Sequence, residues 1–322
     1  MKKHIHILQP DACTFLPYIE APDVMEAFTI TKGATVDERC DAVFCQTYTR
    51  QEMYEKLLET DKPVILHVNG DVWYEMRHIH FDTVLLDAVN AICAKALGVV
   101  CLSKFLADSG LRDVPGGNIT YLPRGLWGVA HTPNGVEPGR FRLKETFNGE
   151  NPLVMSQIGL SLPWKFAGIP LFFEAIRGLA PNARFVNVGT TRGHEELAAK
   201  WEAEFNMTFV EPVPDWPELL LTADVYVHPS LYDTWGRSVA EAMCCGLPVL
   251  AYDAGGVPEL SDKILYCPPD DAAATASIFS DLMARPDDWP AMGRVLHEEA
   301  RRLDAAHRND YRDILLRLMA VL

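Results

Sequence analysis

Residues 225–259 read VYVHPSLYDTWGRSVAEAMCCGLPVLAYDAGGVPE, and this stretch decides the fold. A short apolar run, 225–228, is followed by a loop, by an amphipathic segment that starts at Gly236, and by Gly246, a residue type common just after a helix. A second apolar run starts at Pro248 and ends in a Gly-Gly loop. The pattern predicts two neighbouring parallel strands joined by a helix, with both loops at the carboxyl ends of the strands, where open α/β sheets bind ligands.

The same alternation of apolar runs and amphipathic segments continues on both sides of this stretch. Strands are expected at 3–8, 25–30, 42–45, 63–68, 98–102 and 119–122, and again at 153–159, 184–189, 208–210, 224–228, 248–252 and 264–266. Helices are expected at 48–60, 80–96, 103–110, 168–180, 193–204, 216–222, 236–245 and 271–285, with one or two more over 289–321. The alternation predicts an α/β protein with two Rossmann-like domains, each a parallel sheet with helices on both faces.

Turn-forming residues mark the expected boundary between the two series. They accumulate at 132–138 and again at 148–152. We therefore expect a first domain over 1–148, a second over 149–305 and a C-terminal helix over 306–322.

Composition bounds the class of protein. The chain has 322 residues, 48% hydrophobic and 23% charged, with a net charge of -15 and eight cysteines. The acidic balance argues against a general nucleic-acid binder, because nonspecific affinity comes from clustered Lys and Arg. No apolar run approaches the roughly 18 residues of a membrane-spanning helix, and no Cys-x-x-Cys pair suggests a zinc or redox site. We expect a cytoplasmic protein with reduced thiols and no membrane span.

The start of the helix in the quoted stretch offers groups that suit a nucleotide. Gly236 lets the backbone approach a ligand, and the amides of Gly236, Arg237 and Ser238 lie at the positive end of the helix dipole, which favours phosphate. Glu241 follows about one turn later, within reach of a ribose diol, and Asp233 precedes the helix, within reach of hydroxyls beyond the phosphates. Similar strand-loop-helix units with Gly-Gly turns occur in many α/β proteins, so the interpretation depends on the whole set of motifs.

Taken together, these motifs resemble the signature of family 4 of the retaining, GT-B-fold glycosyltransferases, which transfer a sugar from a nucleotide donor. The matching residues are Pro229-Ser230, Asp233, Trp235-Gly236, Glu241-Ala242-Met243, Cys245-Gly246-Leu247-Pro248-Val249 and Gly255-Gly256-Val257-Pro258-Glu259, supported by Asn134-Gly135-Val136-Glu137, Phe141 and Val186-Asn187-Val188-Gly189. The resemblance covers residues 150–285 and thins over the first domain. It implies two Rossmann-like domains facing across a cleft and a C-terminal helix that crosses back to the first domain.

The resemblance also implies roles for individual residues. Glu241 would hold the ribose, Asp233 would contact the donor sugar, and the amides from Gly236 to Ser238 would bind the diphosphate. Asp233 departs from the family pattern, in which Glu is usual.

A second motif of the family supplies cations to the diphosphate. The usual Gly-Arg-Leu-x-x-x-Lys-Gly is matched at Gly159 and Lys165, but Leu160 stands in place of the Arg. Charge builds on the departing diphosphate and needs fixed cations or amides. Lys165 is the first candidate for this role, Arg237 the second and Arg192 the third.

The first domain carries fewer matches. Gln9-Pro10-Asp11-Ala12-Cys13 replaces the Gly-Gly loop that often follows the first strand in the family. His67 ends an apolar strand where relatives place a His that faces the cleft, and its expected role is a hydrogen bond to the donor sugar or the acceptor, with a purely structural role as the alternative. Ser103 resembles a recurrent family Ser and is expected to cap a helix.

The resemblance implies a retaining, metal-independent hexosyltransferase that uses a UDP- or GDP-sugar as co-substrate, with UDP favoured and no cofactor. A small-molecule or glycan acceptor is favoured over a lipid-linked one, because the first domain shows no basic amphipathic helix. No Asp-x-Asp or His cluster suggests a metal site.

Other functions stay open. A catalytically inactive nucleotide-sugar-binding or scaffolding relative is motivated by the missing Arg and by Asp233. Another GT-B enzyme, such as an epimerase or a phosphorylase, is the next alternative. A dinucleotide dehydrogenase is disfavoured, because no Gly-x-Gly-x-x-Gly follows the first strand.

Overall fold

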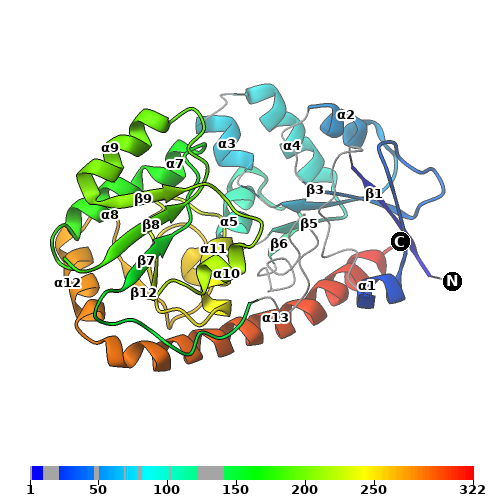
Figure 1. Cartoon of the computed structure of the whole chain (residues 1–322). Coiled ribbons are helices and arrows are strands. Elements are labelled where there is room, and N and C mark those ends of the chain that lie inside the picture. Colours follow the sequence, from blue (N-terminus) through cyan, green and yellow to red (C-terminus); the bar gives the residue numbers. More distant parts are fainter. Residues whose placement is uncertain are drawn as a thin grey trace. The chain divides into compact units, whose positions relative to one another are not determined.

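The chain folds into two compact units that are each built around one parallel sheet (Figure 1). The computed structural model describes residues 2–9, 22–46, 51–68, 70, 72–78, 82–101, 103–121 and 141–322. Unit 1 comprises Met1–Gly128 and Asp304–Leu322, and unit 2 comprises Val129–Leu303.

The sheet of unit 1 has the strand order β2-β1-β3-β4-β5-β6. Its strands are β1 (His4–Leu8), β2 (Thr29–Gly33), β3 (Ala42–Gln46), β4 (Val64–Val68), β5 (Gly98–Cys101) and β6 (Ile119–Tyr121). Its helices in the described ranges are α1 (Pro22–Ala27), α2 (Gln51–Glu59), α3 (Val72–His78), α4 (Thr83–Lys95) and α5 (Lys104–Asp113). The hydroxyl oxygen of Ser103 accepts a hydrogen bond from the Leu106 amide at 3.2 Å, so this residue caps α5 as expected.

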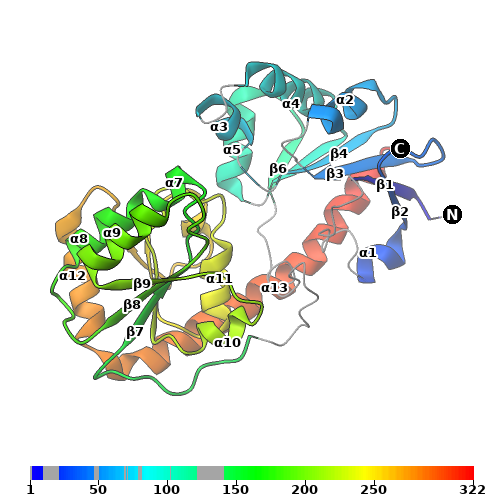
Figure 2. The same ribbon diagram turned by 45° about the horizontal axis from the view of Figure 1, so that its top comes forward.

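The sheet of unit 2 has the order β12-β11-β10-β7-β8-β9. Its strands are β7 (Leu153–Ser156), β8 (Arg184–Val188), β9 (Met207–Val210), β10 (Val225–His228), β11 (Val249–Tyr252) and β12 (Leu265–Cys267). Its helices are α7 (Pro163–Phe166), α8 (Gly168–Ala175), α9 (Glu195–Phe205), α10 (Trp216–Leu220), α11 (Arg237–Cys244) and α12 (Ala272–Met283). Figure 2 shows α8 and α9 on one side of the strands and α11 on the other, as the two-faced cover of a Rossmann-like sheet requires.

The strand order of unit 2 determines where a ligand can bind. From β7 the chain adds β8 and β9 on one side, then returns to place β10, β11 and β12 on the other. The loops after β7 and β10 therefore leave the sheet in opposite directions, and a crevice opens between them at the carboxyl ends of the strands.

One expected strand was wrong. Residues 25–30 were expected to be extended, but the structure has the end of α1 followed by β2 at Thr29–Gly33. Pro22 stands at the start of α1, a position that its fixed φ suits. The strand itself lies at the sheet edge and is half exposed, so its polar residues show no apolar run. The short helices α3 and α7 were not expected.

The segment from residue 141 to 148 packs on unit 2, although it was expected at the end of the first domain. The amide of Lys144 donates to the Cys245 carbonyl at 2.9 Å, and the amide of Asn148 donates to Asp224 Oδ1 at 2.9 Å. These contacts place the segment with the second sheet. The turn expected at 132–138 lies outside the described residues.

The last helix, α13 (Trp289–Met319), runs from unit 2 into unit 1 as one element. Its last turns pack with the sheet of unit 1, where Ile314, Leu315 and Met319 join the core cluster that includes Ile5 and Phe44. Among the described residues, no helix has an apolar stretch long enough to cross a bilayer.

Candidate active site

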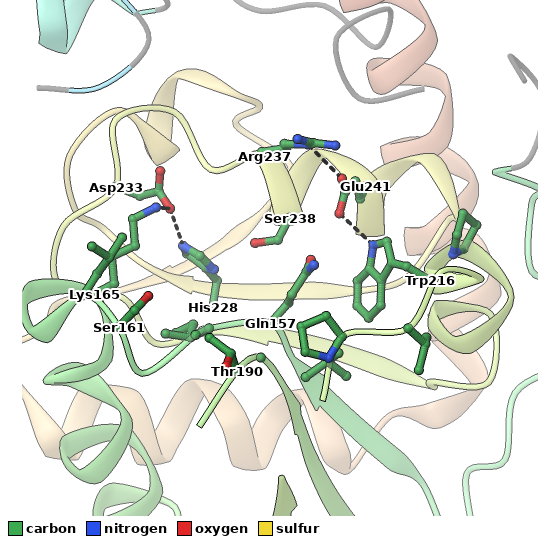
Figure 3. A pocket seen from close by; sticks show the side chains of 18 of the residues that line it. Gln157, Ser161, Lys165, Thr190, Trp216, His228, Asp233, Arg237, Ser238 and Glu241 are labelled. Carbon is green, nitrogen blue, oxygen red and sulfur yellow. Dashed lines mark hydrogen bonds and ion pairs between the residues drawn. The ribbon is translucent and has the colours of Figure 1, made fainter. Parts of the chain in front are cut away.

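Unit 2 contains a cavity of about 470 Å³ at the crevice predicted by its strand order. Its walls are the loops after β7, β8, β9 and β10, the short helices α7 and α10, the end of β10 and the first turns of α11. Figure 3 shows two charged groups at its opposite ends: Lys165, Asp233 and His228 at one, and Arg237, Glu241 and Trp216 at the other, with Ser238 and Gln157 between them. We call them the Asp233 group and the Glu241 group.

The carboxylate of Asp233 has partners on both oxygens. Oδ1 accepts hydrogen bonds from the amides of Trp235 at 3.3 Å and Gly236 at 3.0 Å. Oδ2 accepts one from Lys165 Nζ at 3.0 Å and lies 3.5 Å from His228 Nε2. Burial opposes ionisation of this carboxyl group, but Lys165 and His228 outweigh burial and lower its pKa well below the ordinary value. Asp233 is therefore a buried, ionised carboxylate.

Two glycines determine where Asp233 lies. The amide of Gly256 donates to the Asp233 carbonyl at 2.8 Å. Gly255 has φ of +61°, and a Cβ there would lie 2.0 Å from the same carbonyl oxygen. The Gly-Gly loop after β11 thus packs directly on the backbone of the loop after β10.

Lys165 is carried by the short helix α7, which begins with Pro163. The neighbouring Phe166 ring packs edge-on against His194 and Trp201, with centroids 5.5 and 6.0 Å apart. This packing anchors α7 to α9 and fixes the base of the Lys165 side chain. Its ammonium group contacts Asp233, which comes 68 positions later in the sequence.

The Glu241 carboxylate is buried and faces the cavity, at only 3% exposure. Its Oε2 accepts a hydrogen bond from Trp216 Nε1 at 2.7 Å, and its Oε1 accepts one from Arg237 Nε at 3.1 Å. The Arg237 contact links residues one helical turn apart in α11, whereas Trp216 comes from α10. The carboxylate is thereby held in one orientation at the cavity wall.

The beginning of α11 differs from expectation in one respect. Gly236 is the N-cap, with φ of +84°, and its amide donates to Asp233 Oδ1. We expected this amide to be available to a phosphate together with those of Arg237 and Ser238. It instead donates to the carboxylate of Asp233, which lies three residues before Gly236 in the loop after β10. Arg237 and Ser238 both line the cavity.

Of the other expected site residues of the second domain, Gly159 lines the cavity and Arg192 does not. Gly159 lines the cavity, in the loop after β7. Arg192 is exposed and is absent from the cavity wall, and its amide donates to Thr190 Oγ1 at 3.3 Å. Leu160, at the position where the resemblance implies an Arg, is fully buried in the core of unit 2. That position supplies no cation to the cavity.

His67 lies in unit 1, near the end of β4, and the cavity of unit 2 does not include it. It pairs in register with Gln46 of β3 and Val100 of β5, and its ring centroid is 6.1 Å from that of Phe44. The side chain is 2% exposed. The loop that replaces the Gly-Gly motif lies outside the described residues from position 10 onward.

Sequence reasoning missed two side chains that contact the cavity's carboxylates. His228 is the last residue of β10 and contacts Asp233, and Trp216 contacts Glu241. His228 stands directly before the Pro-Ser motif, so its position at a strand end was a usable signal. Trp216 gave no local signal, because its contact joins residues 25 positions apart. Among the described residues, no three His, Cys, Asp or Glu side chains gather as a metal site requires.

Comparison with known proteins bears on this cavity directly. Residues 158–285 match the family model of the glycosyl transferases group 1. That segment contains every residue of the cavity wall except Gln157. The match supports glycosyltransferase activity. The residues that resemble the family are those that build the cavity.

Curated relatives match over part of their length. The O-antigen chain mannosyltransferase B of Escherichia coli is 36% identical over 80 residues, which are 24% of this chain and 20% of the relative. The UDP-Gal:α-D-GlcNAc-diphosphoundecaprenol α-1,3-galactosyltransferase of Escherichia coli is 29% identical over 147 residues, 40% of this chain and 37% of the relative. The chain thus matches about a fifth to just over a third of the length of these relatives.

A solved structure matches the whole chain. The Anabaena protein HepE, in complex with UDP and glucose, superposes with a TM-score of 0.72 at 14% identity, covering 99% of this chain and 100% of that one. This similarity concerns the fold. It confirms the predicted fold class, two Rossmann-like α/β domains of the GT-B type.

Proposed function

We propose that this protein is a retaining glycosyltransferase that transfers a sugar from a UDP- or GDP-sugar to an acceptor hydroxyl. The observation that carries the proposal is the order of groups along the cavity of unit 2. An apolar segment, the Glu241 group, the first turn of α11 and the Asp233 group follow one another, and a nucleotide sugar has its base, ribose, diphosphate and sugar in the same order.

The nucleoside would occupy the end of the cavity near Trp216. The loop after β9 contributes Pro212, Val213 and Pro214, followed by Trp216 and Pro217, and this apolar wall suits the face of a base. A uracil base is favoured because the galactosyltransferase above is named for UDP-Gal and HepE was crystallised with UDP.

The ribose would hydrogen-bond to Glu241. Its two carboxylate oxygens accept hydrogen bonds from Trp216 and Arg237, and these donors would orient the carboxylate toward the ribose hydroxyls. A buried carboxylate held by two donors is a preorganised acceptor for a diol.

The diphosphate would lie between the two groups, against the first turn of α11. Amides at a helix start find no acceptor inside the helix, and the dipole favours an anion there. Lys165 and Arg237 would flank this position, one from each group, and would balance the charge that develops on the leaving diphosphate. We propose that these side chains, and not a bound metal, supply that stabilisation.

The donor sugar would lie beside Asp233. Both oxygens of this carboxylate are held by neighbouring donors, so it fits an orienting acceptor for sugar hydroxyls better than a nucleophile. We therefore propose retention by displacement from the same face, with the leaving phosphate accepting the acceptor's proton. His67 is kept as a proposed contact to the donor sugar or the acceptor from unit 1, and Arg192 as a weaker phosphate contact than Lys165.

The experiment begins with binding and continues to transfer. Thermal unfolding is measured with UDP, GDP, ADP, UDP-glucose and GDP-mannose. A ligand that binds only the folded state, present at a concentration 100 times its Kd, adds about 2.7 kcal/mol to the free energy of unfolding. The stabilising donor, isotope-labelled, is then offered to soluble glycans, small alcohols and a polyprenyl-linked sugar, and NMR reports the anomeric configuration of the product.

Sugar transfer with retained anomeric configuration would support the whole proposal if Asp233→Ala abolishes that transfer. A product of inverted configuration would overturn the retaining mechanism. Binding without transfer to any acceptor would favour the inactive, nucleotide-sugar-binding relative. Buried Leu160, in place of a cation, is the observation that keeps this second candidate. If transfer occurred only to the polyprenyl-linked sugar, the proposed small-molecule or glycan acceptor would be wrong and the acceptor would be lipid-linked.

A further inference from the structure

The charged side chains that line the cavity neutralise one another. Lys165 pairs with Asp233 at 3.0 Å, and Arg237 pairs with Glu241 at 3.1 Å. A nucleotide sugar brings two negative charges on its diphosphate. Binding therefore adds negative charge to a wall whose own formal charge is zero, and an unbalanced charge is costly in a partly buried site.

Lys165 is the cation that the Asp233 group offers to the diphosphate, but it already serves Asp233. Its side chain is 31% exposed, whereas the Asp233 side chain is 10% exposed. If the ammonium group turns toward a phosphate oxygen, Asp233 Oδ2 loses its closest partner in a place that water reaches poorly. A buried carboxylate left without a cation is strongly destabilising.

His228 lies where a replacement cation is needed. Its Nε2 lies 3.5 Å from the same oxygen, Asp233 Oδ2, that Lys165 contacts. Nε2 has to carry a hydrogen to face a carboxylate, which leaves Nδ1 to take up a further proton. Both ring nitrogens are buried, and among the described atoms Nδ1 has no hydrogen-bond partner and Nε2 has only its 3.5 Å contact with Asp233. Histidine is the side chain whose charge changes near neutral pH.

Among the described residues near His228, no other titratable group is placed to supply a positive charge to Asp233. Arg237 and Glu241 of α11 pair with each other at the far end of the cavity. Tyr226 lies on the same face of β10, two residues before His228, and burial raises the pKa of its hydroxyl, so it stays protonated. On the β7 side the wall carries Gln157, which does not titrate.

We propose that His228 takes up a proton from solvent when the nucleotide sugar binds, so that its imidazolium replaces Lys165 as the cation on Asp233 and Lys165 is released to the diphosphate. This inference rests on the proposed function and deepens it. His228 is then a positioning residue that acts through Asp233. Because the complex holds one more proton than the free protein, affinity rises as pH falls through the neutral range, by up to about tenfold per pH unit.

The test is isothermal titration calorimetry of the full chain with UDP-glucose, whose diphosphate is a diester and does not titrate near neutral pH. Titrations near pH 7 in buffers of low and high ionisation enthalpy give the number of protons taken up. We expect up to about one proton per ligand, and a Kd at about pH 6.5 that is roughly tenfold or more below the Kd at about pH 8.5.

Two variants separate His228 from other histidines. His228→Gln keeps a polar side chain but cannot titrate, so it should bind more weakly, without proton uptake and with a Kd that does not change with pH. His297→Gln is the matched control. His297 is a part-buried histidine of the same unit whose Nδ1 lies 2.7 Å from the Cys244 carbonyl at the other end of α11. This variant should keep the proton uptake of the wild-type protein.

A second measurement, NMR of the histidine ring nitrogens, uses only the wild-type protein. In the wild-type chain with ¹⁵N-labelled histidine, one ring-nitrogen pair should move to the imidazolium position when UDP-glucose is added near neutral pH. Binding of UDP-glucose without proton uptake, or without such a shift, would overturn the inference alone. Failure to bind UDP-glucose or GDP-mannose at any pH would overturn the proposed function and this inference with it.

Discussion

A Cβ atom at Gly255 would lie 2.0 Å from the carbonyl oxygen of Asp233, so these two residues pack backbone to backbone. The next amide, that of Gly256, donates a hydrogen bond to the same oxygen at 2.8 Å. The Gly-Gly motif therefore packs against the loop that carries Asp233. These contacts hold the main chain of Asp233 in place.

Substituting Gly255 should therefore disturb both stability and donor binding. Gly255→Ala meets a positive φ and a backbone oxygen that cannot move aside, so we expect a loss of about 2–4 kcal/mol in the free energy of unfolding. Urea unfolding measures this. Gly178→Ala is the control, since φ there is +75° with no atom within 4 Å of the added Cβ, and it should cost about 1 kcal/mol. Equal losses in both variants would refute the close contact.

The two candidate cations, Lys165 and Arg192, should behave differently. Lys165→Met removes a charged donor from the cavity wall and should weaken UDP binding by roughly 10- to 100-fold. Arg192 is exposed and outside the wall, so Arg192→Met should change the Kd by less than about twofold. Calorimetry with UDP measures both, and an equal effect of the two substitutions would count against the cavity as the diphosphate site.

The indole of Trp216 should contribute to recognition of the ribose. Trp216→Phe keeps an aromatic side chain but removes the hydrogen bond to Glu241, so the preference for UDP over 2′,3′-dideoxy-UDP should fall by roughly 5- to 10-fold.

Trp289→Phe is the matched control for this substitution. It removes an indole hydrogen bond to the Leu282 carbonyl, at 3.0 Å, in the core of the same unit. It should lower stability and leave the ratio of the two dissociation constants unchanged. If both variants kept the wild-type ratio, Glu241 would not depend on Trp216.

Asp233 should make stability sensitive to acid. Its pKa is lower in the folded protein than in the unfolded chain, so the unfolded chain binds the proton first as pH falls. The stability it confers is therefore present above about pH 4 and is lost below that value.

Urea unfolding between about pH 3 and pH 7 should show a smaller loss of stability in acid for Asp233→Asn than for the wild-type protein. Asp262→Asn is the control, because that side chain is 81% exposed and pairs only at the surface with Lys263. It should follow the wild-type curve. An unchanged pH dependence in Asp233→Asn would mean that its carboxylate is not held as the structure indicates.

The quoted stretch shows how far local patterns reach. Residues 225–228 and 249–252 are fully buried strands, and apolar runs bounded by turn residues are sufficient to predict them. The helix between them begins at Arg237, directly after the glycine that the sequence marked. The edge strand β2 was misplaced because a half-exposed strand needs no apolar run.

Sequence motifs predicted most of the charged residues of the site, but they did not predict the hydrogen-bond partners of these residues. Gly236 was expected to offer its amide to a phosphate, but it donates that amide to the Asp233 carboxylate, three residues before it. Motif spacing states which residues are near in sequence. It does not state which hydrogen-bond donor each acceptor takes.

The sequence by itself determined the fold class, the parallel strands apart from the edge strand β2, and the identity of Asp233, Glu241 and Lys165 as candidates, because periodicity and turn chemistry act over a few residues. Only the tertiary structure decided that Lys165 and His228 share one oxygen of Asp233, and that Trp216 holds Glu241. These contacts join separate loops, and which loops meet depends on the order of the strands in the sheet. That order arises from packing of the whole unit, and no local pattern encodes it.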